Sequence, residues 1–231
     1  MTTARFDIVL PDYAEQALRM IEDAGFEAWC VGGCVRDAIL GRDVHDYDIA
    51  TSASWTEAEE AFLKHGVPVH RTGTKHGTIT AVVQDQAIEV TTYRVDGTYS
   101  DGRHPDSVEF TQSIEEDLMR RDFTINALAY HPDRGICDCC NGIGDLEQGI
   151  IRTVGDPGKR FAEDGLRILR GCRFASQLGF SIEPETLLAM KTFKMRLSKV
   201  SAERITHEMD ALLLGDHVYD ALMESIDVLG A

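Results

Sequence analysis

The chain has 231 residues, of which 43% are hydrophobic and 27% are charged, a composition typical of a folded globular protein. Its formal net charge of −16 excludes a surface that is basic throughout, as a general nucleic-acid binder would have. No stretch approaches the roughly 18 uninterrupted apolar residues of a membrane span, and the first residues lack the order of a signal peptide. We therefore expect one large domain, or a medium domain with a helical annex, in the cytoplasm.

The first half of the chain alternates short helices and strands. In chain order, the apolar pattern predicts a helix over 12–25, a strand over 27–31, a helix over 33–40, a strand over 47–50, a helix over 55–65, and strands over 77–83, 86–93 and 107–110. The segment 96–107 is rich in Gly, Ser and Asp and is predicted to be a long mobile loop. From Asp156 onward the pattern is helical, which places a domain boundary between 1–153 and 154–231.

The charge is unevenly distributed along this second part. Residues 152–173 carry six Arg or Lys, residues 191–204 carry five, and none follows Ile205. A phosphate-rich ligand could be attracted to this band. Because no secretory signal is present, the six cysteines are predicted to be reduced: Cys30, Cys34, Cys137, Cys139, Cys140 and Cys172. Cys137 and Cys140 form one CxxC, but no second CxxC or HxxxH completes a zinc site.

The first candidate site residues stand between the strand at 27–31 and the helix at 33–40. Gly32 and Gly33 let the backbone approach a ligand, and a helix N-terminus suits phosphate. A tight strand-to-helix turn uses glycine as well, so these two residues alone leave both interpretations open.

Three carboxylates follow. Asp46 and Asp48 are two positions apart in an extended segment, so they point the same way and could share Mg²⁺, although such pairs also occur in solvated loops. Glu89 alternates with the apolar Ile88 and Val90, so it faces away from them. From a neighbouring strand it could meet the two aspartates. Three such acids form the usual cradle for a two-metal nucleotidyl transfer. Taken alone, Glu89 fits an exposed strand residue better.

The segment RRDFTINALAY (120–130) is predicted to be a helix. Asp122 and Asn126 would then share one face, with Arg120 and Arg121 at the start, able to hold phosphates or a ribose. The alternative is a core helix that carries an Asp near its start.

Five segments, in this order, together resemble the class II CCA-adding tRNA nucleotidyltransferases and the related bacterial poly(A) polymerases: GGCVRD, DYD, EVTTYR, RRDFTINALA and DPGKRFAEDGLRILRGCRFASQLGF. The resemblance implies an α+β fold, with a DNA polymerase β-like nucleotidyltransferase head of mixed sheet and flanking helices, followed by an all-helical neck. It implies Mg²⁺ on Asp46 and Asp48, with Glu89 as the third carboxylate. It further implies nucleotide-binding residues at Gly32, Gly33, Arg36, Arg120, Arg121, Asp122, Asn126, Asp164, Arg167, Arg170 and Arg173.

The base-reading residues can also be argued physically. Asp164 and Arg167 are three apart on the predicted helix, so an acceptor and a fork of donors project from adjacent turns. Cytosine and adenine both present an amino donor beside a ring nitrogen acceptor, whereas guanine and uracil place a carbonyl there. One pair could therefore select C and A without a template. The alternative is a surface helix with salt pairs, which stabilises little.

The sequence departs from the resemblance in two places. The cysteine-rich loop at 135–149 stands where relatives have a DPFGG-like sequence. The chain stops at Ala231, after SAERITHEMDALL (201–213), whereas relatives continue into helical body and tail regions. We therefore expect a partial protein. In the family, absence of the long loop goes with enzymes that add only the two cytidines, so the loop at 96–107 favours an activity that includes A.

The function implied is template-independent transfer of CMP and AMP from CTP and ATP to the 3′ end of tRNA, with release of pyrophosphate and no covalent intermediate. Three alternatives stay open at this point: a poly(A) polymerase, an enzyme that adds only A, and a non-catalytic nucleotide- or RNA-binding module. Use of CTP on tRNA that lacks its terminal CCA separates the first two from CCA addition. An intact DYD (46–48) argues against the third.

Overall fold

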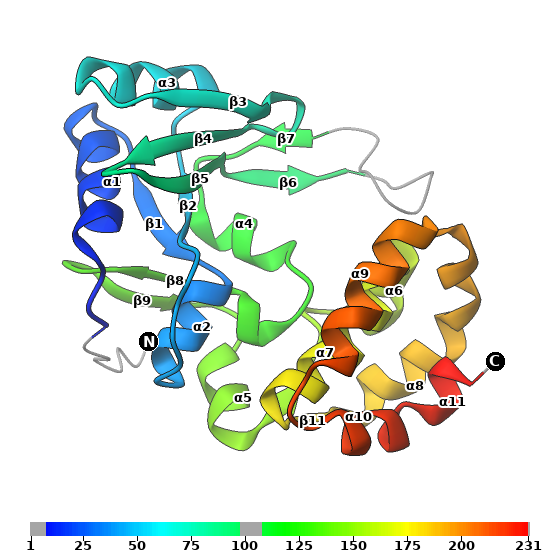
Figure 1. Cartoon of the computed structure of the whole chain (residues 1–231). Helices are drawn as coiled ribbons and strands as arrows, with labels where there is room; N and C mark the ends of the chain where they lie inside the picture. The colour runs from blue at the N-terminus through cyan, green and yellow to red at the C-terminus, as the bar shows by residue number, and fades with distance from the viewer. Residues whose placement is uncertain (1–7, 98–107, 231) are drawn as a thin grey trace. The chain divides into compact units, whose positions relative to one another are not determined.

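The computed structural model describes residues 8–97 and 108–230, and the chain forms two compact units (Figure 1). The first unit comprises the described residues of 1–95, 108–120 and 126–139. The second comprises those of 96–107, 121–125 and 140–231. The predicted loop at 96–107 lies mostly outside the described residues.

The first unit is built on a seven-stranded mixed sheet in the order β3-β4-β5-β2-β1-β8-β9. All neighbouring strands are antiparallel except β2 and β5, which run parallel. The strands are β1 (Ala28–Val31), β2 (Asp48–Thr51), β3 (Val69–Gly73), β4 (Thr78–Val83), β5 (Gln86–Thr92), β8 (Leu128–His131) and β9 (Gly135–Asp138); β6 (Arg94–Asp96) and β7 (Val108–Phe110) form a separate pair.

The described residues of this unit also form the helices α1 (Asp12–Asp23), α2 (Gly33–Ile39), α3 (Trp55–Lys64) and α4 (Ile114–Met119). α1 and α3 contact each other and the sheet. α1 buries Ala14, Ala17, Leu18 and Ile21, the apolar positions that predicted it. α3 begins at a capping box, in which the Ser54 hydroxyl accepts from the Glu57 N–H and the Glu57 carboxylate accepts from the Ser54 N–H.

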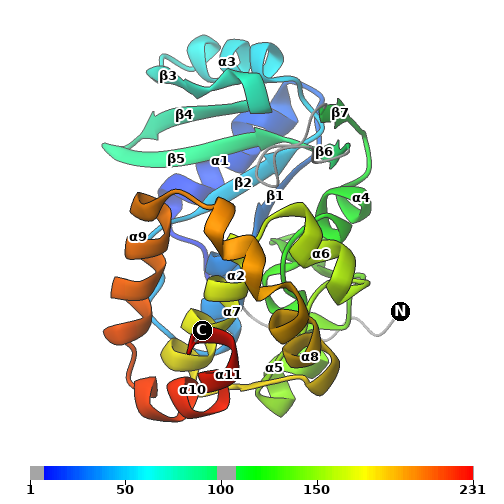
Figure 2. The ribbon, with the colours of Figure 1, turned by 90° about the vertical axis from the view of Figure 1, so that its right-hand side faces the viewer.

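The part of the second unit from 140 onward that the structure describes is mainly helical and contains the short parallel pair β10 (Ile150–Ile151) and β11 (Ser181–Ile182). Helix α7 (Leu166–Leu178) contacts both α9 and α10, and all three helices are labelled in Figure 2. The helices are α5 (Gly142–Gln148), α6 (Pro157–Glu163), α7 (Leu166–Leu178), α8 (Pro184–Phe193), α9 (Ala202–Leu213), α10 (Val218–Glu224) and α11 (Ile226–Leu229), with a 3₁₀ segment, η3 (Lys194–Lys199), before α9. The predicted fold class, a mixed sheet with flanking helices followed by a helical region, is confirmed.

The predicted helix over 120–130 is wrong. The chain leaves α4 at Arg120, and the backbone of Asp122 and Thr124 pairs with Val154 and Arg152, so the segment is extended there. A short 3₁₀ turn, η2 (Thr124–Asn126), then leads into β8. Residues 122–131 are all buried, and β8 is an inner strand paired with both β1 and β9. A helix would leave the backbone groups of those two strands unpaired. Asp122 and Asn126 therefore do not share a helical face.

The second correction concerns the predicted helix that carries Asp164. α6 ends at Glu163, Asp164 is extended (φ −139°, ψ 112°), and α7 begins at Leu166. A side chain at Gly165 would place its Cβ 2.9 Å from the carbonyl oxygen of Arg196, so the chain passes η3 too closely for any residue but glycine. Arg167, Arg170 and Arg173 do share α7, as predicted, whereas Asp164 stands outside it.

Among the described residues, no helix has the length and apolar character needed to span a bilayer. The cytoplasmic location and the boundary near 154 stay predictions.

Candidate functional site

The turn between β1 and α2 requires glycine. Gly32 has φ 79° and ψ −129°, a conformation that other residues rarely adopt. Gly33 opens α2, and a Cβ placed on it would lie 3.6 Å from Nη2 of Arg36. The Arg36 guanidinium donates to Asp37 and to Oδ1 of Asn126, at 2.7 Å for the latter contact. Two predicted nucleotide contacts from distant parts of the sequence, Arg36 and Asn126, therefore touch each other.

The three predicted carboxylates lie on two adjacent strands. Asp48 begins β2 and is the direct register partner of Glu89 on the parallel strand β5. Asp46, Asp48 and Glu89 are exposed, whereas Tyr47 and Ile49 between them are buried. This alternation directs both aspartates to the same side, as predicted, and that side faces away from the core.

A cavity of about 240 Å³ lies beside the glycine turn and the two aspartates. Its lining joins the start of α2 to the segment before β2: Gly33, Cys34, Asp37, Asp43, Val44, His45, Asp46 and Asp48. The lining is polar and rich in carboxylates, which suits a ligand that arrives with a cation.

The carboxylates fit a hard divalent ion by chemistry, because Mg²⁺ is bound by carboxylate oxygens with several waters retained. Within the described ranges, no set of three or more His, Cys, Asp or Glu side chains is already gathered closely enough to hold a metal ion. The side chains of Asp46, Asp48 and Glu89 are therefore not already arranged as a set of three metal ligands. Cys30, Cys34 and Cys172 are buried, whereas Cys139 is exposed; the reduced state of the thiols stays a prediction.

The Arg120 side chain makes its hydrogen bonds to Asp117 within the first unit. Its guanidinium donates two hydrogen bonds, of 2.7 and 2.9 Å, to Oδ1 of the buried Asp117. Arg121 follows in the non-helical turn and belongs to the second unit. Asp117 was not singled out from the sequence, because nothing in its spacing separates it from the acidic surface residues of the same helix.

Asp122 lies at the centre of a charge network in the second unit. Its Oδ2 accepts from Nε of Arg170 at 2.8 Å, and its Oδ1 accepts from the Phe123 N–H at 2.8 Å. Burial by itself raises the pKa of Asp122, but the charge and hydrogen bond of Arg170 and the Phe123 N–H outweigh it and lower the pKa to about 2. Asp122 is therefore an anion across the physiological pH range.

The network continues to α9. Oε2 of Glu208 accepts from Nε of Arg173 at 2.6 Å, and its Oε1 lies 3.6 Å from Nη1 of Arg170. Two carboxylates thus balance the two arginines, and both guanidinium groups lie over the Phe174 ring. Glu208 could not be found from the sequence, because its partners lie 35 and 38 residues away.

Asp164 and Arg167 are positioned by different partners. Asp164 accepts from the Leu166 N–H at 2.9 Å and from Arg204 at 3.0 Å. Arg167 pairs with the Glu163 carboxylate and donates to the Arg160 carbonyl oxygen at 3.1 Å. Asp164 and Arg167 are thus near neighbours across the joint between α6 and α7, and each is already oriented by the protein.

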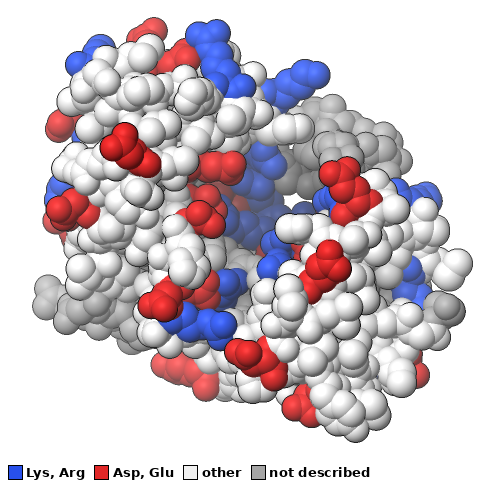
Figure 3. Space-filling model, in the orientation of Figure 1, with Lys and Arg blue, Asp and Glu red and all other residues white. Residues whose placement is uncertain are grey.

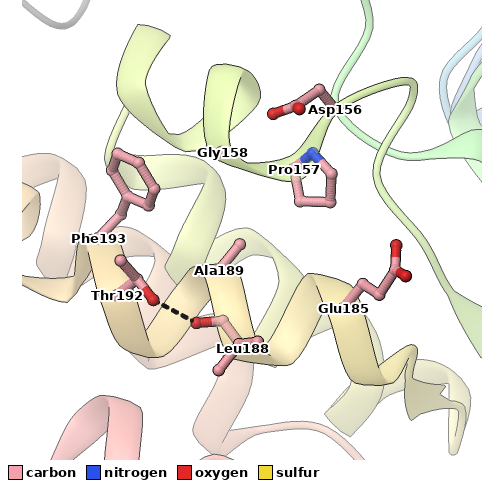
Figure 4. Close-up of a pocket in the computed structure, with 8 residues that line it drawn as sticks. All are labelled: Asp156, Pro157, Gly158, Glu185, Leu188, Ala189, Thr192 and Phe193. Atoms are coloured by element: carbon pink, nitrogen blue, oxygen red, sulfur yellow. Dashed lines mark hydrogen bonds between the residues drawn. The ribbon is translucent and has the colours of Figure 1, made fainter.

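Acidic and basic side chains are interspersed on the face shown in Figure 3, and neither sign covers it continuously. A second cavity, of about 320 Å³, lies between the start of α6 and α8 (Figure 4). Its lining contains none of the predicted site residues: Asp156, Pro157, Gly158, Glu185, Leu188, Ala189, Thr192 and Phe193. It is therefore not part of the candidate site.

Comparison with known proteins gives consistent matches. The CCA-adding enzyme of Limosilactobacillus fermentum is 48% identical over 214 residues, which is 93% of this chain and 52% of that protein. The crystal structure of the Bacillus stearothermophilus CCA-adding enzyme in complex with CTP has a TM-score of 0.85 at 40% identity and covers 94% of this chain and 52% of that one. The Thermotoga maritima CCA-adding enzyme complexed with tRNA_CCA has a TM-score of 0.78 at 26% identity, with coverage of 96% and 52%.

The chain spans about half the length of these relatives. The family model for the probable RNA and SrmB-binding site of polymerase A matches residues 179–225. The model for the poly A polymerase head domain matches residues 28–152, which include β1, the glycine turn, the three carboxylates and the segment that leads into β8. The chain therefore belongs to the poly A polymerase head domain family.

Proposed function

We propose that this chain is the catalytic and nucleotide-selecting part of a template-independent tRNA nucleotidyltransferase. It transfers CMP and AMP from CTP and ATP to the 3′ end of tRNA, in CCA addition or repair. The observation that carries the proposal is the direct pairing of Asp48 with Glu89 on parallel strands, with Asp46 two positions earlier at a cavity beside the glycine turn. The similar proteins bear the name CCA-adding enzyme.

In this reaction the 3′ hydroxyl oxygen bonds to the α-phosphorus, the bond to the β-phosphate oxygen breaks, and pyrophosphate leaves with its electron pair. Members of the family generally use a divalent metal ion. We assign Asp46 and Asp48 as Mg²⁺ ligands, with Glu89 as the third carboxylate; the ion would favour the deprotonated hydroxyl and offset the negative charge on the phosphates. The carboxylates thus supply binding and orientation, and no covalent enzyme intermediate is formed.

We propose nucleotide-binding residues on each of the two units, taken separately. On the first unit we assign Gly32, Gly33, Arg36, Arg120 and Asn126. On the second we assign Arg121, Asp122, Arg170 and Arg173 to sugar and phosphates, and Asp164 and Arg167 to the base. The Asp164 carboxylate accepts from the amino group of C or A, and Arg167 donates to the neighbouring ring nitrogen. A carbonyl in place of the amino group, as in G or U, leaves buried groups unpaired at about 1–3 kcal/mol each.

The partners follow from the same assignment. We propose tRNA as the acceptor, a head over 1–153, a neck over 154–231 and a cytoplasmic location. The match at 179–225 to an RNA-binding family model supports an RNA substrate. Because the relatives are about twice as long, we assign much of the RNA-binding surface to the part of such proteins that this chain does not match.

The test is an extension assay on tRNA that ends before CCA and on tRNA that ends in CC, with each nucleotide alone and in pairs. We expect CMP to be incorporated first and AMP only after two CMP. Incorporation of AMP alone on both tRNAs would overturn the proposal in favour of a poly(A) polymerase, and activity only on the CC end would favour an A-adding enzyme. Asp46→Ala is the matched control, since it removes one exposed carboxylate and should abolish the activity of the same preparation.

A further inference from the structure

The base-reading carboxylate stands outside any helix, and this raises the question of what orients it. Asp164 occupies the extended joint between α6 and α7, where its backbone N–H donates to the Arg160 carbonyl oxygen at 3.4 Å and its carbonyl oxygen accepts from the Arg167 N–H at 3.2 Å. Its carboxylate is held by two further donors: the Leu166 N–H on Oδ1, at 2.9 Å, and Nη2 of Arg204 on Oδ2, at 3.0 Å. A side chain with two rotatable bonds needs both contacts to fix the plane of its carboxylate.

Arg204 is suited to this task. It projects from α9, 40 residues beyond Asp164, and only 27% of its side chain is exposed. Its second terminal nitrogen, Nη1, is buried and makes no hydrogen bond with any residue that the structure describes. Burying a donor without a partner costs free energy, so an ion pair that served stability alone would be better placed at the surface. The position of Arg204 is explained better by what it does to Asp164.

The helix that carries Arg204 is anchored independently of it. One turn further along α9, Glu208 binds Arg173, and the Leu212 carbonyl oxygen accepts from the Ser176 hydroxyl at 2.7 Å. α9 therefore stays packed on α7 when Arg204 is substituted, and the Leu166 N–H still holds one oxygen of Asp164. The expected consequence of losing Arg204 is a carboxylate that rotates, not a neck that unfolds.

We propose that Arg204 is a specificity-determining positioning residue: it fixes the Asp164 carboxylate in the orientation that accepts from the amino group of C or A. This inference rests on the proposed function, because it takes Asp164 as the base reader. Arg204 acts through Asp164 and does not itself touch the reacting atoms. Its loss should therefore weaken selection of the base more than binding of the triphosphate, which all nucleotides share.

The experiment measures the dissociation constants of CTP, ATP and UTP with Mg²⁺ for the wild-type chain, Arg204→Gln, Arg204→Lys and Lys191→Gln. Lys191→Gln is the matched control, since it also removes one positive charge and one ion pair, with Asp227, from the second unit. For Arg204→Gln we expect the preference for CTP over UTP to fall about tenfold, the loss of one charge-assisted hydrogen bond. Arg204→Lys should restore part of the preference, and Lys191→Gln should keep all of it.

Two outcomes overturn the inference. One is an unchanged ratio of the CTP and UTP constants in Arg204→Gln; the other is an equal loss for all three nucleotides together with a lower Tm, the result of a merely structural role. If Arg204→Gln does not fold, the ratio in Arg204→Lys at unchanged Tm decides in the same way. Extension of tRNA by the wild-type chain is measured in a separate assay. If the wild-type chain binds CTP more tightly than UTP but extends no tRNA, only the proposed activity is refuted. If the wild-type chain binds both nucleotides equally, the role of Arg204 is refuted.

Discussion

The buried pair of Asp122 and Arg170 offers the sharpest test of the second unit's energetics. Asp122→Asn removes the negative charge but keeps an amide oxygen that can accept from the Phe123 N–H. Breaking a fully buried pair costs about 3–5 kcal/mol. The Arg170 side chain is 34% exposed and keeps Glu208 as a second partner at 3.6 Å. We therefore expect a loss of about 2–3 kcal/mol in the free energy of unfolding.

The assay is urea unfolding followed by circular dichroism, with a thermal scan beside it. The expected loss corresponds to a fall in Tm of about 4–12 °C for a chain of this size. Asp227→Asn is the control, since it breaks an ion pair of similar length (2.9 Å) in which the aspartate side chain is 69% exposed. That substitution should cost no more than about 0.5 kcal/mol. Equal effects of the two substitutions at pH 7 would refute the reasoning.

The pH dependence gives the same prediction a second measurement. Because Arg170 lowers the pKa of Asp122 from 3.8 to about 2, the pair contributes its full stability above the unfolded value and loses it as the pH falls through the folded one. The difference between wild type and Asp122→Asn should therefore be constant from about pH 8 to pH 5 and shrink only below about pH 4. A difference that already declines between pH 7 and pH 5 would show that another group is responsible.

Three further predictions concern the first unit. Asp48→Asn should lower nucleotide incorporation at least about a hundredfold, because it neutralises a carboxylate that we propose as a metal ligand, while Tm stays unchanged since the side chain is exposed; a parallel fall in Tm would assign it a structural role. Gly77→Ala should lower the free energy of unfolding by about 1–3 kcal/mol, measured in urea, because φ is +77° and the new Cβ would lie 2.7 Å from the Phe110 ring; a neutral result would contradict that contact. The exposed Cys139 should react with a thiol reagent first and Cys30 only on unfolding, since burial raises the pKa of the Cys30 thiol and shields it; early modification of Cys30 in a mass-spectrometric time course would refute this.

The sequence could predict helices in which apolar residues recur at the helical spacing over several turns, or in which capping residues mark the start of the helix. α1 shows its buried face at the helical spacing, and α6 starts at Asp156 and Pro157, a cap and a first-turn proline. The alternation of Ile88, Glu89 and Val90 likewise gave the exposed carboxylate on β5. These features depend on residues close together in the chain, so local physics is sufficient to determine them.

The strand β8 was not predicted, because local sequence does not distinguish it from a helix. All four of its residues are buried, so the sequence shows a continuous apolar run that a core helix would show as well. Only pairing with β1 on one edge and β9 on the other decides between the two structures. The break at Asp164 was missed similarly, because it depends on the approach of Gly165 to the Arg196 backbone, 31 residues away.

By itself, the sequence determined which residue types are present, the order of the motifs, the family they resemble, and the alternation that exposes Asp46, Asp48 and Glu89. The tertiary structure decided which of those residues meet. The register of β2 on β5 sets Glu89 beside Asp48, and the packing of α9 on α7 brings Arg204 to Asp164 and Glu208 to Arg173. Hydrogen bonds and ion pairs act over a few ångströms in space, and the separation along the chain carries no information about them until the backbone has folded.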